Sequence, residues 1–189
     1  MKTCPKRNLK ALRRNNEGVT AVEFALIAPV LLLMVMGTTE VGLMMFAQNV
    51  MEGSAFSGSR TGKTGYVADG LTQEETIVQT INERAGVLMD TDNISVTSLT
   101  YSEFGDVGQP EPFVDTNGNG VRDYGENYTD VNGDGEYSDD MGIAGFGTGQ
   151  EITMYTITYD WPIFSPLLQP IMGETKTLTA VTVVKNEPY

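Results

Sequence analysis

The chain has 189 residues, one cysteine (Cys4) and no histidine, which excludes an intramolecular disulfide and a Ser-His or Cys-His catalytic centre. Its formal net charge of −13 is unevenly spread, because residues 1–18 hold six of the twelve basic residues, whereas residues 19–189 hold 6 basic and 24 acidic residues, a net charge of −18. This acidic body repels nucleic acid and suits cations, so we expect a protein that is neither an enzyme nor a nucleic-acid binder.

An apolar run from Val19 to Thr39 follows the basic residues. Its 21 residues would span about 30 Å as a helix, the thickness of one bilayer core. The run is too long for the apolar region of a signal peptide, and no small-x-small cleavage site follows it. The positive charges predict a cytoplasmic leader at residues 1–18, a transmembrane and extended helix at 19–60, and a periplasmic or extracellular domain at 61–189.

Glu23 lies inside this apolar run, where an ionised side chain is costly and is treated as functional. If the chain were cut after Gly18, Val19 would carry a new positive α-amine. Glu23 lies four residues further on, on the same helix face, so its carboxylate can neutralise that amine in the same or a neighbouring chain. A buried charge is tolerable when it has such a partner.

The segment Gly18–Phe24 (GVTAVEF) resembles the prepilin-peptidase site of type IV pilins. The longer stretch GVTAVEFALIAPVLLLMVMGTTEVG resembles the N-terminus of TadE-like proteins, the minor pseudopilins of tight-adherence (Flp) pilus systems. The resemblance extends to the second acid Glu40, to the small-residue run Ala55–Arg60 and to the ending Val183–Tyr189. It does not cover the acidic middle of the chain.

This resemblance implies cleavage by a prepilin peptidase on the cytoplasmic side. Gly18 would precede the cut, Val19 would become the terminus, Glu23 would be the pairing carboxylate and Phe24 would belong to the recognition motif. It further implies a bacterial inner-membrane protein, single-pass with a cytoplasmic N-terminus, whose pilin-like helix contacts lipid, other pilins and inner-membrane pilus assembly proteins. Whether the protein stays in that membrane or enters a surface pilus is left open.

Two functions follow from these observations. The first is a minor pilin or pseudopilin that takes part in assembling a tight-adherence type IV pilus. The alternative is a membrane-anchored, calcium-dependent adhesion or binding module that is not processed as a pilin.

The first part of the domain is expected to be helical. Apolar and small residues continue at helical spacing, which predicts one helix from about Val19 to Ser59. The segment Gly58–Gly65 lacks the spacing of a phosphate-binding loop and predicts a helix C-cap and turn. Leu71–Leu88 is predicted to be a helix opened by a capping box of Thr72 and Glu75, and Ile94–Ser102 is predicted to be a strand.

Residues 106–141 form an acidic insert with 10 acidic residues and one arginine. Within it, DTNGNGVRDYGE matches a twelve-residue EF-hand-type calcium loop. Oxygen donors stand at positions 1, 3, 5, 9 and 12, position 6 is glycine, and position 7 offers a backbone carbonyl. The predicted ligands are Asp115, Asn117, Asn119, Val121, Asp123 and Glu126.

The pattern returns fifteen residues later in DVNGDGEYSDD, and Phe113 and Tyr128 precede the two units at the same offset. Position 12 of this second loop is Met141, a poor ligand, so we expect Ca²⁺ at both loops with weaker binding at the second. The alternative is a solvated loop that binds nothing. The predicted ligands of the second loop are Asp130, Asn132, Asp134, Glu136 and Asp140.

The remaining elements are two β-branched segments, Ile152–Trp161 and Thr175–Lys185, which alternate as strands do. We therefore expect an α+β fold: a long N-terminal transmembrane helix, then one helix packed on a roughly three-stranded antiparallel sheet, with the calcium loops inserted. Between these strands, Pro162–Gly173 is a proline-rich apolar loop. We expect the sheet to bury its Phe164, Leu167, Leu168 and Ile171, with contact to lipid or a partner as the alternative.

Overall fold

The computed structural model describes residues 18–188. The predicted basic leader up to residue 17, with Cys4, and the last residue of the C-terminal motif, Tyr189, lie outside the described residues. The described chain forms two compact units. One contains residues 18–42 together with Ile163–Glu174, and the other contains Leu43–Pro162 and residues 175–188.

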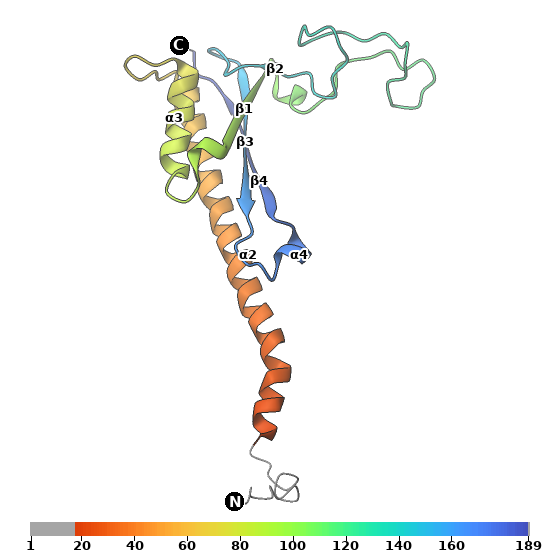
Figure 1. Ribbon diagram of the computed structural model, residues 1–189. Coiled ribbons are helices and arrows are strands. Elements are labelled where there is room, and N and C mark those ends of the chain that lie inside the picture. Colours follow the sequence, from red (N-terminus) through yellow and green to blue (C-terminus); the bar gives the residue numbers. More distant parts are fainter. Residues whose placement is uncertain (1–17, 189) are drawn as a thin grey trace, which may run out of the picture. The chain divides into compact units, whose positions relative to one another are not determined.

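The first described element is a 46-residue helix, α2 (Val19–Thr64), drawn from red to yellow in Figure 1. It includes Pro29, which a membrane helix tolerates. The predicted long helix is confirmed, but it ends at Thr64 instead of near Ser59. The stop comes from Gly65, whose positive φ of 64° is the left-handed conformation that closes many helices. Most of the segment predicted as cap and turn is therefore still helical.

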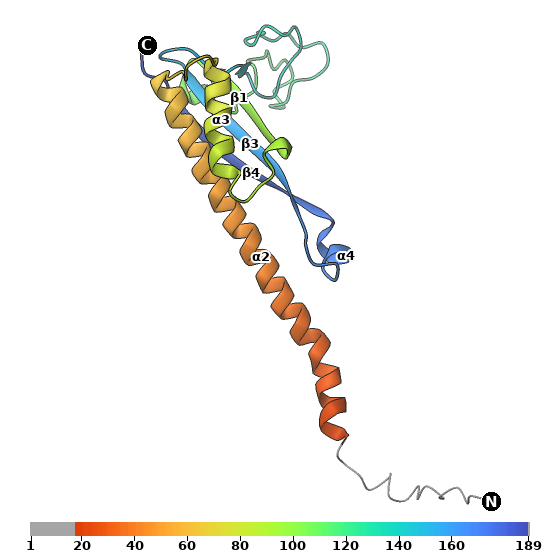
Figure 2. The ribbon, with the colours of Figure 1, turned by 60° about the vertical axis from the view of Figure 1, so that its left-hand side comes forward.

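The second helix, α3 (Gln73–Ala85), is the expected one. Its N-cap is Thr72, whose side chain accepts a hydrogen bond from the Glu75 backbone N–H at 3.2 Å, while the Glu75 carboxylate accepts from the Thr72 N–H at 2.7 Å. The predicted capping box is thus confirmed. Figures 1 and 2 both show α3 alongside the carboxyl-terminal part of α2.

A four-stranded antiparallel sheet completes the α+β fold, in the order β2-β1-β3-β4. Its strands are β1 (Ile94–Tyr101), β2 (Ile143–Ala144), β3 (Ile152–Pro162) and β4 (Thr175–Lys185). In the register, Tyr155 of β3 pairs with Ser98 on one side and Thr182 on the other. The three predicted strands are confirmed, and the two-residue edge strand β2 is additional. Short helices lie at Thr91–Asn93, Phe104–Asp106 and, as α4, Gln169–Met172.

One hydrophobic core joins the carboxyl-terminal part of α2, the inner face of α3 and one face of the sheet. Met51, Ile77, Ile81 and Tyr155 are completely buried in it. Alternate residues of β3 face this core, as the period-2 pattern of the strand predicts. Other members are Ala47, Ala55, Ala85, Met89, Ile157, Tyr159, Trp161, Leu178 and Ala180.

The end of β4 is fixed by the described part of the C-terminal motif. Asn186 is buried, and its side-chain amide donates to the Thr148 carbonyl at 3.0 Å and to the Thr153 hydroxyl at 3.2 Å. The Glu187 N–H donates to the Lys63 carbonyl at 2.9 Å, and the side chains of these two residues form an ion pair at 3.6 Å. These residues therefore join the last strand to β3 and to the end of α2.

Candidate functional site

The amino-terminal end of α2 contains the residues predicted to direct processing. The Gly18 carbonyl accepts a hydrogen bond from the Val22 N–H at 3.1 Å, so the helix begins directly after Gly18. Val19, Glu23 and Phe24 are all exposed, and among the described residues no basic side chain forms an ion pair with Glu23. A cut after Gly18 would therefore leave α2 complete.

Glu40, the second acid of α2, is buried, with 4% of its surface exposed. Its carboxylate oxygens accept hydrogen bonds from the backbone N–H groups of Phe164 at 3.0 Å and Ser165 at 3.2 Å. Both partners belong to the loop between β3 and β4, which lies in the same compact unit as this part of α2. Glu40 therefore anchors that loop to the helix.

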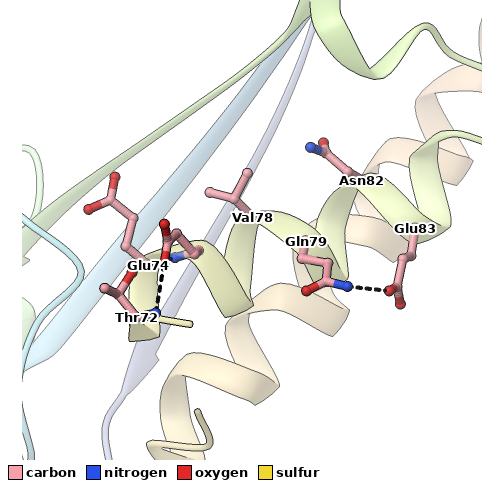
Figure 3. Close-up of a pocket in the computed structure, with 7 residues that line it drawn as sticks. Thr72, Glu74, Val78, Gln79, Asn82 and Glu83 are labelled. Atoms are coloured by element: carbon pink, nitrogen blue, oxygen red, sulfur yellow. Dashed lines mark hydrogen bonds between the residues drawn. The ribbon is translucent and has the colours of Figure 1, made fainter. Parts of the chain in front are cut away.

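A shallow hollow of about 780 Å³ lies along α3. Figure 3 shows the side chains that line it. The described residues that line it all come from α3 and its N-cap, between Thr72 and Glu83. Several of their polar groups are used locally, in the capping box and in the hydrogen bond from the Gln79 amide to Glu83 at 3.0 Å. The described lining comes from a single helix and its N-cap, so the described residues do not bring polar groups from separate elements together here.

The acidic insert has its own small framework, built from equivalent positions of its two sequence repeats. Phe113 and Tyr128 form an antiparallel bridge. The Tyr137 ring packs edge-to-face on both, with centroids 6.0 and 5.6 Å apart. The Arg122 guanidinium lies 4.6 Å from the Tyr128 ring and 4.8 Å from the Tyr137 ring. This aromatic cluster holds the two loops side by side.

In the first loop, Asp115 organises the backbone. One of its carboxylate oxygens accepts from the Gly118 N–H at 2.6 Å and the other from the Gly120 N–H at 2.8 Å. These N–H groups, with that of Gly120 contributing most, lower the pKa of the Asp115 carboxyl. The side-chain carbonyls of Asn117 and Asn119 each accept from the N–H two residues later, at 3.0 and 2.8 Å.

The loop is closed by Glu126 at position 12. One carboxylate oxygen accepts from the Thr116 N–H, at position 2, at 2.8 Å, and the other accepts from the Asp123 N–H, at position 9, at 2.9 Å. The glutamate is thereby brought across the loop to the residue that follows Asp115. A series of hydrogen bonds thus links Glu126 through Asp123 and the two asparagines to Asp115.

The second loop repeats this geometry. Asp130 accepts from the N–H groups of Gly133 at 2.6 Å and Gly135 at 3.0 Å, the same positions 4 and 6 as in the first loop. The side chains of Asn132 and Asp134 accept from the N–H two residues later, at 2.9 and 2.7 Å. The glycines at positions 4 and 6 have positive φ in both loops, between 75° and 82°.

The closing carboxylate of the second loop comes from Glu111, a residue that the sequence reasoning missed. It is completely buried. Its oxygens accept from the N–H groups of Val131 at 2.7 Å and Ser138 at 3.1 Å, which are positions 2 and 9 of that loop. These are the positions that Glu126 closes in the first loop. The signal was present in the sequence, because Glu111 and Glu126 are fifteen residues apart, as the two repeats are.

Asp140, the residue predicted to supply the last ligand of the second loop, is placed elsewhere. Its carboxylate accepts from the Tyr101 hydroxyl at 2.9 and 3.0 Å and from the Gly142 N–H at 3.0 Å. Burial, followed by this hydrogen bond, raises the pKa of Tyr101 to about 12. The pair therefore joins the end of the insert to strand β1.

The donors of the two loops suit a calcium ion in kind. Among residues 18–188, no group of three or more Asp, Glu, His or Cys side chains is arranged to hold a metal by itself. The loops instead offer mixed carboxylate, amide and carbonyl oxygens, which Ca²⁺ prefers. The amides of Asn117 and Asn119 donate to one oxygen of Asp123, at 2.6 and 2.9 Å. The Asp123 carboxylate is thereby held between the two asparagine side chains.

Taken together, the fold is that of an α+β protein with one apolar N-terminal helix that is long enough to cross a membrane, with a mean hydropathy of 2.4 over its most apolar window. The family model described as TadE-like protein matches residues 18–60, which supports the TadE-like family and indicates a single-pass membrane protein related to Tad pili. This family is structural and not enzymatic. The match covers less than a quarter of the chain and does not include the insert. No curated protein matches the chain, and no solved structure matches it.

Proposed function

We propose that the chain is a minor pseudopilin that a prepilin peptidase cuts between Gly18 and Val19, and that takes part in assembling a tight-adherence type IV pilus. The observation that carries this proposal is that the family match and the helix begin at almost the same residue. The TadE-like match begins at residue 18, and α2 begins at Val19. The bond proposed for cleavage is therefore the junction between the leader and an intact helix.

In this function, Glu23 pairs with the new α-amine of Val19, in its own chain or in a neighbouring pilin. The exposed face of α2 supports such packing, because Val19, Glu23 and Phe24 are all accessible to another helix. The basic leader keeps the N-terminus in the cytoplasm, so the domain faces the periplasm. Partners are the peptidase, other pilins, inner-membrane assembly proteins and lipid.

The test is the intact mass of the chain isolated from membranes with and without a prepilin peptidase. The proposal expects a chain that begins at Val19 only when the peptidase is present, and no cutting of Gly18→Ala. Gly37→Ala is a matched control, since an added Cβ meets nothing within 4 Å at either glycine. A chain that begins at Met1 under both conditions would refute processing and favour the anchored binding module.

Glu23→Gln separates docking from cleavage, with the exposed helix acid Glu52→Gln as the control. If Glu23 is the pairing carboxylate, its variant loses assembly into pili while Glu52→Gln retains it. If assembly of Glu23→Gln is normal, the proposed pairing is refuted, whatever the result for cleavage.

We further propose that the insert binds two calcium ions, which order residues 106–141 against the mutual repulsion of their ten acidic residues. The first ion would be held by the six predicted residues of the first loop. The second would be held by the second loop with Glu111 in place of a position-12 residue. Affinities of about 10⁻⁴–10⁻³ M would suit an extracellular module. The donor chemistry and the equal closure of both loops support this proposal.

Titration calorimetry and thermal unfolding of the full chain in detergent micelles, with calcium as the titrant, test this idea. We expect two binding events in the wild type and the loss of one event in each of Glu126→Gln and Glu111→Gln. Glu136→Gln is the matched control, because position 7 contributes only its backbone carbonyl. If several millimolar calcium produced neither heat nor a thermal shift, the calcium proposal would be refuted, and the pilin proposal would stand.

A further inference from the structure

The loop between β3 and β4 exposes large apolar side chains. Residues 163–173 contain no charged residue. Phe164, Leu167 and Ile171 are 59%, 56% and 75% exposed, whereas Ile163 and Leu168 are buried. The expected burial under the sheet is therefore wrong for three of the four side chains. The two buried residues hold the loop in place, and the three exposed ones form an apolar patch.

The loop has a fixed shape. The Ile163 N–H donates to the Glu174 carbonyl at 2.8 Å, which closes its base. The Leu168 N–H donates to the Ser165 carbonyl at 3.0 Å, and the side-chain amide of Gln169 donates to the Ile163 carbonyl at 2.9 Å. The apolar patch is therefore presented on an ordered support.

The loop is also bound to α2, at Glu40, just beyond the apolar run. Glu40 directly follows Val19–Thr39, and its carboxylate accepts from the N–H groups of Phe164 and Ser165. The Ser165 hydroxyl lies 4.0 Å from the sulfur of Met36, one turn earlier in the helix. Since the apolar run matches the thickness of one bilayer core, Glu40 would lie where the helix leaves the hydrocarbon.

We propose that residues 163–173 form a second membrane contact, in which Phe164, Leu167 and Ile171 enter the lipid boundary where α2 leaves the bilayer. This inference rests on the membrane-spanning helix of the proposed function. Lipid is the occupant that these positions favour, because the patch and the apolar run belong to one compact unit and Glu40, at the end of that run, binds the loop directly. Aromatic and aliphatic side chains without charge suit this boundary.

The contact also accounts for the buried Glu40. A carboxylate at the edge of a bilayer is costly unless hydrogen bonds satisfy it. The two loop N–H groups do so, and they hold the patch at the same depth as the carboxylate. Since the loop is uncharged, its contact with lipid does not depend on anionic headgroups, which the acidic body would repel.

The experiment places an environment-sensitive fluorophore on single cysteines of the full chain, with Cys4→Ser as background, in nanodiscs of phosphatidylcholine. The labelled variants are Leu167→Cys in the patch, Met34→Cys in the apolar run and Val87→Cys in the domain. Met34 and Val87 are matched exposed positions, at 67% and 84%. Quenching by lipids with a spin label near the headgroup end of the acyl chain reports contact with the boundary.

The proposal expects a blue shift and strong quenching at Leu167→Cys, and neither at Val87→Cys. If the label at residue 167 behaves as the label at residue 87 does while Met34→Cys reports lipid, the loop does not touch the membrane and this inference is overturned. If the label at Met34→Cys also reports water, the membrane-spanning helix of the proposed function is refuted as well. The nanodisc holds one chain and no partner. If the patch binds another protein instead of lipid, the label at residue 167 will therefore behave as the label at residue 87 does.

A second variant tests the anchor. Glu40→Ala removes both acceptors, so quenching at Leu167→Cys should fall markedly while quenching at Met34→Cys is unchanged. Fluorescence of Trp161, the single tryptophan, which is buried in the other unit, checks that the domain still folds. Unchanged quenching at residue 167 in a folded Glu40→Ala protein would contradict the positioning role of Glu40.

Discussion

Small residues on α2 allow α3 to pack closely against it, and Gly58 is the critical one. A Cβ atom added at Gly58 would lie 2.5 Å from Cγ1 and 2.8 Å from Cδ1 of Ile81. Ile81 is completely buried, so it has little room to move. We therefore expect Gly58→Ala to force α2 and α3 apart or to push Ile81 out of its rotamer.

The magnitude follows from two opposing terms. Overpacking a tight core by one methyl group costs about 1–3 kcal/mol. Replacing a glycine by alanine inside a helix returns about 0.5–1 kcal/mol. Gly53 lies in the same helix, and its added Cβ meets nothing within 4 Å, so Gly53→Ala carries only the second term. The difference between the two variants isolates the packing cost of about 1–3 kcal/mol.

The assay is urea unfolding of the full chain in detergent micelles, followed by the fluorescence of Trp161, which is 3% exposed. Gly53→Ala should be slightly more stable than the wild type, and Gly58→Ala should be less stable than Gly53→Ala. Equal free energies of unfolding for the two variants would mean that the α2–α3 contact does not form as described. Close packing against α3 would then not explain why small residues occur in Ala55–Arg60.

Three further changes can be measured in the same unfolding assay. Ile81→Ala should lower the free energy of unfolding by about 2–5 kcal/mol, because it leaves a cavity among completely buried residues; a loss well below 1 kcal/mol would contradict the described core. Thr72→Ala should cost about 1 kcal/mol through loss of the N-cap, and an unchanged midpoint would argue against the capping box. Hydrogen bonds from Thr72 lower the pKa of Glu75 below its ordinary 4.5, and the bond from the Thr72 backbone N–H has the largest effect. The Glu75 carboxylate therefore stabilises the fold fully above pH 4.5, and this stabilisation is lost as the pH falls through the lowered pKa. The stability difference between the wild type and Glu75→Ala should therefore be smaller at pH 3 than at pH 7, and a difference independent of pH would refute this role.

The elements with local signals were predictable from the sequence. The capping box of Thr72 and Glu75 marks the start of α3 through chemistry that lies within four residues. Strand β4 has its predicted limits, Thr175–Lys185, because β-branched residues fill it and glycine and asparagine lie close to its ends. The calcium-loop pattern likewise predicted a sharp turn at Gly120, where the glycine adopts the left-handed conformation with a φ of 78°.

Features that depend on distant contacts were not predictable. Strand β2 has only two residues, and it exists because Leu99 and Thr100 of β1 offer an edge to Ile143 and Ala144. The loop that exposes Phe164, Leu167 and Ile171 is bound to Glu40, more than 120 residues away. No periodicity within either segment contains that information.

Glu111 shows most clearly why pattern matching along the chain is incomplete. A loop that is counted forward from Asp130 places Met141 at position 12, because the count assumes that a loop supplies its own ligands. In the fold only the first loop does so: Glu126 closes it from position 12. The second loop is closed by Glu111, which lies fifteen residues before Glu126 and outside the loop that it closes. The second loop therefore depends on a residue that precedes the first, whereas the first loop does not depend on the second. If calcium binds as proposed, Glu111→Gln should weaken binding at the second loop and leave the first unchanged, and equal weakening at both loops would refute this assignment.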